Sequence, residues 1–83
     1  MPIRLPTVDA IRKEIAERAA EITSGSAQYL SGLLGPVEAV HEGRHASEAR
    51  WRLAYYHGTP SQNAAIEQAA AIVQRAKPFI QAD

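Results

Sequence analysis

The fold class of this chain depends on residues 44–57, Arg-His-Ala-Ser-Glu-Ala-Arg-Trp-Arg-Leu-Ala-Tyr-Tyr-His. As a strand, the stretch would alternate its faces, with Trp51, Leu53 and Tyr55 on one and Arg50, Arg52 and Ala54 on the other. As a helix, it would align Ala46, Ala49, Leu53 and Tyr56 on one face. Its three alanines and its glutamate favour a helix, whereas its aromatic residues favour a strand. We predict a helix and keep the strand as the alternative.

The segment at residues 7–24 has the pattern of an amphipathic helix. Thr7 is a suitable N-cap, and Asp9 lies near the positive end of the helix. Apolar residues recur at helical spacing, at Val8, Ile11, Ile15, Ala19 and Ile22. The other face carries acid-before-base pairs four residues apart, Asp9–Lys13 and Glu14–Arg18. Ser24-Gly25 ends the predicted helix.

A second helix is predicted at residues 60–77. The sequence Thr59-Pro60-Ser61-Gln62 has the form of a capping box with proline at the first helical position. The apolar stripe of this helix is rich in alanine and comprises Ile66, Ala69, Ala70, Val73 and Ala76. Pro78 ends the helix.

Between these helices, residues 22–37 carry no charge. Leu30, Leu33, Leu34 and Val37 repeat at helical spacing. Gly35-Pro36 ends one predicted helix and is also a suitable start for another. In a small domain such a segment is most often buried on several sides. The alternative is a surface that a partner covers.

Together these patterns predict one all-α domain over residues 1–83, a small bundle of four or five helices. The helices at 7–24 and 60–77 would pack around the apolar segment 26–34, and 44–57 would supply an aromatic face. The alternative is an α-β-β-α arrangement in which 37–41 and 50–56 pair as a central hairpin.

Composition excludes several classes of protein. The chain has 83 residues and no cysteine, so it is neither a disulfide-stapled scaffold nor a thiolate metal protein. No apolar run is long enough to span a membrane, and the N-terminus lacks a signal-peptide pattern, so we expect a cytoplasmic protein. Nine basic and nine acidic side chains cancel, which makes nucleic acid an unlikely partner.

One string of catalytic type is present, His41-Glu42-Gly43-Arg44-His45, which matches H-E-x-x-H. Over these five residues the chain resembles the zincin metallopeptidases. The resemblance implies zinc ligands at His41 and His45 and a general base at Glu42, with Glu67 as the candidate third protein ligand. We expect no catalytic residue, metal or cofactor, and we keep a zinc-dependent hydrolase at this string as the alternative.

The segment 50–56 combines arginine with aromatic residues, the composition of protein-interface hot spots. We predict that its partner-binding residues are Arg50, Trp51, Arg52, Tyr55 and Tyr56. Nearby glutamates offset the arginines, so no basic field forms. Only 22 apolar residues are larger than alanine, and such a thin core favours association. We therefore expect a non-enzymatic interaction domain that docks on, inhibits or oligomerises with a protein partner, including a second copy of itself.

Overall fold

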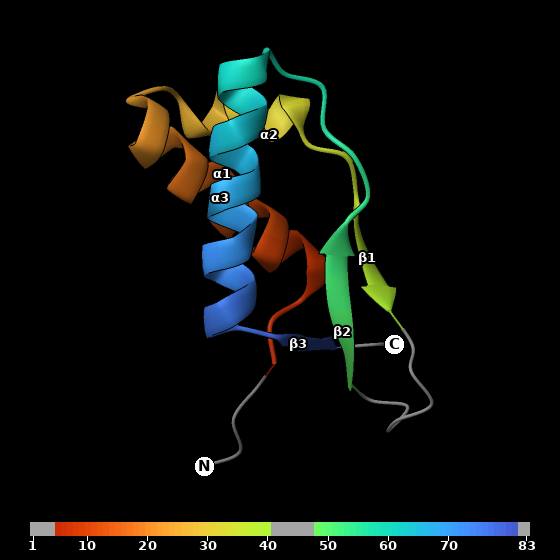
Figure 1. Ribbon diagram of the computed structural model, residues 1–83. Helices are drawn as coiled ribbons and strands as arrows, with labels where there is room; N and C mark the ends of the chain where they lie inside the picture. Colours follow the sequence, from red (N-terminus) through yellow and green to blue (C-terminus); the bar gives the residue numbers. More distant parts are fainter. Residues whose placement is uncertain (1–4, 41–47, 82–83) are drawn as a thin grey trace.

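A computed structural model describes residues 5–40 and 48–81 of the chain. Its elements follow the order α1 (Val8–Thr23), α2 (Ala27–Leu33), β1 (Val37–Val40), β2 (Glu48–Leu53), α3 (Pro60–Ala76) and β3 (Phe79–Gln81). The three strands form one antiparallel sheet in the order β1-β2-β3. The three helices lie together to one side of the sheet (Figure 1).

The prediction of an all-α bundle is wrong. Of the stretch 44–57, the described part forms strand β2 followed by a loop, because alternate side chains of β2 enter the core while the others face outward. The alternative α-β-β-α arrangement is closer, since β1 pairs with β2 in the register Val37↔Leu53 to Val40↔Arg50. That alternative still lacked β3, which pairs with β2 through Ala49↔Ile80 and its neighbours.

Both long helices are confirmed, and their end signals act as the sequence indicated. The Thr7 hydroxyl accepts the N–H of Ala10 at 3.2 Å, and α1 ends at Ser24 in the left-handed conformation. The capping box of α3 is complete, with Thr59 and Gln62 satisfying each other's backbone N–H groups at 2.8 and 3.3 Å. These local hydrogen bonds remove unsatisfied backbone donors from the helix starts.

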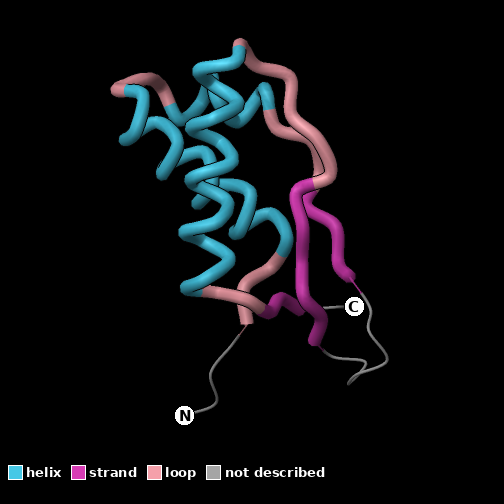
Figure 2. The backbone as a smooth tube through the Cα atoms, viewed as in Figure 1, coloured by secondary structure: helices cyan, strands magenta, loops and turns pink. Residues whose placement is uncertain are grey.

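Figure 2 shows the helices to one side of the strands. The core takes its residues from both the helices and the sheet. Its largest fully buried side chains come from helices and strands alike: Trp51, Ile11, Ile15, Leu30, Ile66, Ile80 and Val73. Several alanines lie among them and allow α1 and α3 to pack closely, including Ala16, Ala19 and Ala69. Among the described residues, no helix combines the length and the apolar character needed to cross a membrane.

Candidate functional site

Trp51, one of the predicted partner-binding residues, lies in the core. Only 2% of its surface is exposed, and its indole N–H donates to the Lys77 carbonyl at 2.7 Å. The Trp51 carbonyl in turn accepts the side-chain amide of Gln74 at 2.5 Å. Trp51 therefore joins β2 to the end of α3 and has almost no surface to offer a partner.

Arg50 and Arg52 lie on the outer face of the sheet, away from the helices. The guanidinium of Arg52 contacts the Glu38 carboxylate at 3.3 Å across the β1–β2 ladder. Arg50 lies over the ring of Phe79, with 5.8 Å between the guanidinium carbon and the ring centroid. Both arginines are exposed, and an exposed ion pair such as Arg52–Glu38 contributes little to stability.

Tyr55 and Tyr56 follow β2 and point to different surroundings. Tyr55 is 51% exposed, and its ring lies directly against Gly35, where an added Cβ would come within 2.7 Å of it. The half-buried Tyr56 donates its hydroxyl hydrogen bond to the carboxylate of Glu67 on α3. This hydrogen bond is the main reason that the pKa of Tyr56 is raised above 10.0, and desolvation and the negative charge of Glu67 act in the same direction.

The metal hypothesis falls largely outside the described residues. His41, Glu42 and His45 are not among them, so the structure does not place these side chains relative to one another. Glu67, the candidate third ligand, is described and binds Tyr56. Within residues 5–40 and 48–81, no three side chains of the types that bind metals are grouped. The expectation of no metal and the alternative of a zinc site both stay predictions.

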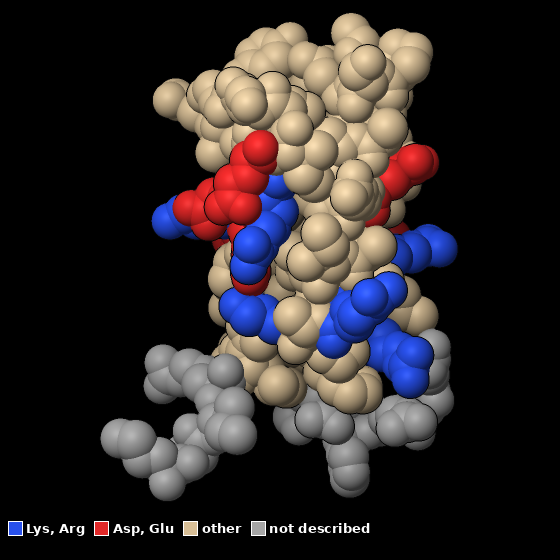
Figure 3. Space-filling view, turned by 60° about the vertical axis from the view of Figure 1, so that its left-hand side comes forward, with Lys and Arg blue, Asp and Glu red and all other residues tan. Residues whose placement is uncertain are grey.

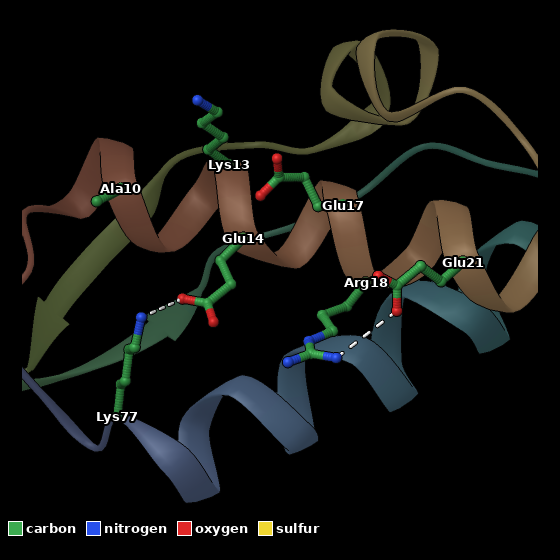
Figure 4. Close-up of a pocket in the computed structure, with 7 residues that line it drawn as sticks. All are labelled: Ala10, Lys13, Glu14, Glu17, Arg18, Glu21 and Lys77. Atoms are coloured by element: carbon green, nitrogen blue, oxygen red, sulfur yellow. Dashed lines mark hydrogen bonds and ion pairs between the residues drawn. The ribbon is translucent and has the colours of Figure 1, made fainter.

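A charged hollow of about 530 Å³ lies between α1 and the end of α3 (Figure 4). It contains two ion pairs, Lys77–Glu14 at 2.7 Å and Arg18–Glu21 at 3.6 Å. Three basic and three acidic side chains line it: Lys13, Arg18, Lys77, Glu14, Glu17 and Glu21. Their formal charges cancel.

The most distinctive surface of the described structure is one end of the molecule, which we call the uncharged end. It is formed by residues 22–37 and 53–66, neither of which contains an aspartate, glutamate, lysine or arginine. The backbone joins the two segments, since the His57 N–H donates to the Leu33 carbonyl at 2.9 Å and Leu34 forms a bridge with Tyr56. Figure 3 shows charged side chains over the middle and lower parts of one face and none at its upper end.

Much of the uncharged end is exposed, contrary to the expectation that residues 22–37 are buried on several sides. In α2 only Leu30 is buried. Ile22 is 42% exposed and Tyr29 is 60% exposed, and Tyr55 adds a third large side chain. The sequence shows that residues 22–37 carry no charge, but it does not show that this segment lies beside residues 53–66.

Arg12 holds the uncharged end in place. Its guanidinium donates four hydrogen bonds to the end of α2 and the turn after it, to Ser31 Oγ at 3.0 Å and to the carbonyls of Ser31, Leu34 and Gly35 at 2.6, 2.7 and 3.2 Å. Sequence reasoning missed this residue. The one feature of the sequence that could have indicated its role is its position on α1, directly after the buried Ile11.

Phe79 was also missed, and no element was predicted after Pro78. It places an aromatic ring on the outer face of the sheet beneath Arg50. Comparisons of the chain with protein-family models, with curated proteins and with solved structures find no match, so the surfaces described above carry the functional argument.

Proposed function

We propose that this protein is a non-enzymatic interaction domain that self-associates through its uncharged end. The observation that carries the proposal is that the exposed Ile22, Tyr29 and Tyr55 all lie in the two segments that contain no aspartate, glutamate, lysine or arginine. Depletion of charged residues and enrichment of aromatic ones distinguish the centres of protein interfaces from ordinary surface.

A second copy is the occupant that this surface fits best. A two-fold symmetric interface brings the same patch of both copies together, so any charged residue near the axis faces its own copy. The uncharged end avoids that repulsion. The net charge of zero also removes long-range repulsion between copies.

A stable dimer sets the area that the uncharged end would have to bury. A stable interface buries about 800 Å² on each partner. The whole molecule exposes 5619 Å², so such an interface needs about one-seventh of its surface. The uncharged end contains 16 + 14 = 30 of the 83 residues. Of the predicted partner-binding residues, Tyr55 and the half-buried Tyr56 belong to this surface, while Arg50 and Arg52 remain predicted contacts on the outer sheet face.

The test compares two isoleucines that lie on different surfaces but have almost the same exposed fraction. Ile22 on the uncharged end is 42% exposed, and Ile72 on α3, outside that end, is 43% exposed. We expect the mass of the wild-type protein to rise toward that of a dimer with concentration in sedimentation equilibrium. Ile22→Glu and Tyr29→Glu should each weaken the dimer at least about tenfold, a loss of about 1.4 kcal/mol. Ile72→Glu should leave it unchanged.

Salt dependence provides a second measurement. An interface without charges should keep its dissociation constant as ionic strength rises, whereas one formed by Arg50 and Arg52 should weaken. A monomeric mass at every concentration contradicts the proposal. Equal effects of Ile22→Glu and Ile72→Glu, or a dimer that dissociates in salt, contradict the assigned surface.

A further inference from the structure

The two outer edges of the sheet differ in whether the chain itself occupies them. At β3, the Gln81 N–H donates to the Pro6 carbonyl at 3.1 Å, so the segment before α1 lies along that edge. At β1, no element among residues 5–40 and 48–81 lies beyond the strand (Figure 1). Among the described residues, therefore, the β1 edge is the one that no other segment of the chain lines.

The hydrogen-bond pattern shows which backbone groups of β1 point outward. The Ala54 N–H donates to the Pro36 carbonyl at 3.0 Å, immediately before the pair Val37↔Leu53. Antiparallel pairs alternate between bonded and non-bonded, so Glu38 and Val40 bond to β2 while Val37 and Ala39 direct their N–H and C=O groups away from it. The opposite side of β2 agrees, since the Trp51 carbonyl faces away from β1 and accepts Gln74. Val37 and Ala39 thus present two donors and two acceptors along the edge.

An extended polypeptide is the ligand that matches such a row of backbone groups. A second copy of β1 fits poorly. The antiparallel register that uses both Val37 and Ala39 would centre on Glu38 and place the two Glu38 carboxylates directly opposite each other. Like charges in that position destabilise a strand pair, whereas a basic residue opposite Glu38 stabilises it and would share the carboxylate with Arg52, which contacts it at 3.3 Å from β2.

Side chains beside β1 define the rest of the partner's chemistry. Val37 and Ala39 face the helix layer, and a hollow of about 390 Å³ adjoins Val37, with Val8, Pro36 and Tyr55 in its lining. Partner residues paired with Val37 and Ala39 would face this same side. We propose that the outer edge of β1 binds an extended segment of another protein in which a lysine or arginine lies between two apolar residues.

The experiment uses the intact protein and the peptide acetyl-Thr-Val-Lys-Val-Thr-amide at millimolar concentration. Nuclear magnetic resonance of the ¹⁵N-labelled protein should show the largest shifts at the amides of Val37 and Ala39, and those amides should become protected from exchange. A peptide N-methylated at both valines lacks the donors that pair with β1 and should not bind. A peptide N-methylated at lysine loses only a donor that faces away, and it should still bind.

Charge reversal tests the role of Glu38. Replacing the peptide lysine by glutamate should weaken binding about three- to tenfold, because an attractive cross-strand pair becomes repulsive. The protein variant Glu38→Lys should restore binding of the glutamate peptide. The proposal is overturned if the amides of Val37 and Ala39 do not shift, or if the two N-methylated peptides bind equally well. It is also overturned if the dissociation constant changes neither with the peptide charge nor with Glu38→Lys.

Discussion

Replacing Arg12 by lysine tests how the uncharged end is held to the rest of the molecule. The guanidinium of Arg12 donates to four oxygens of residues 31–35 at 2.6 to 3.2 Å, and three of these oxygens are backbone carbonyls at or after the end of α2. A lysine ammonium keeps the charge but lacks the planar fork that reaches several acceptors at once. The variant therefore removes hydrogen bonds while leaving net charge and helix propensity nearly unchanged.

The expected loss can be estimated from these contacts. A hydrogen bond to a charged group contributes about 1.5–3 kcal/mol, and bonds that share one group are not additive. With lysine keeping part of the set, we expect Arg12→Lys to lower the free energy of unfolding by about 2–4 kcal/mol. For a domain with about 5–15 kcal/mol in total, that is a large fraction.

Urea denaturation followed by circular dichroism measures this loss. All samples need the same protein concentration, because self-association would add to apparent stability. The control is Arg18→Lys on the same helix, where the exposed side chain contacts Glu21 at 3.6 Å. We expect the control to change stability by less than about 0.5 kcal/mol. Equal losses in the two variants would refute the assigned role of Arg12, as would a loss below about 0.5 kcal/mol in Arg12→Lys.

Two further predictions concern the glycines and the tyrosines of the uncharged end. The Cβ added by Gly32→Ala in α2 meets nothing within 4 Å, so this variant should raise the free energy of unfolding by about 0.5–1 kcal/mol. The Cβ added by Gly35→Ala would lie 2.7 Å from the Tyr55 ring, which must move, so this variant should lower the free energy of unfolding by about 1–3 kcal/mol. Thermal denaturation should therefore shift the two melting temperatures in opposite directions, and shifts in the same direction would contradict the prediction. The raised pKa of Tyr56 means that its stabilising bond to Glu67 is fully present below about pH 10 and is lost as the pH rises above it. Alkaline denaturation curves of the wild type and Tyr56→Phe should therefore converge above that pH, and curves that stay parallel would contradict this.

The helices were predictable because their signals act within a few residues. The Thr59–Gln62 capping box and the cap at Thr7 need no distant partner, and the apolar spacing of α1 and α3 identifies the buried faces. In α1 that spacing correctly indicated the buried Ile11 and Ile15, although Ile22 at its end is exposed. Local hydrogen bonds and amphipathic spacing are properties of a single segment.

The strand at Glu48–Leu53 was not predictable in the same way, because local preferences in this stretch conflict. Its alanines favour a helix and its alternation favours a strand. The outcome depends on contacts far along the chain, since Trp51 lies in the core and bonds to the Lys77 carbonyl at 2.7 Å. The short strand β3 likewise exists only through its pairing with β2.

The features of the candidate surfaces also fall into those visible in the sequence and those visible only in the structure. The sequence by itself determined that residues 22–37 carry no charge, that the net charge is zero and that arginine and aromatic residues gather at 50–56. Only the tertiary structure decided that Trp51 is internal, that 53–66 lies beside 22–37 and that, within residues 5–40 and 48–81, nothing lines the outer edge of β1. The physical reason is that composition and spacing are local, whereas burial and exposure depend on the packing of segments distant in sequence.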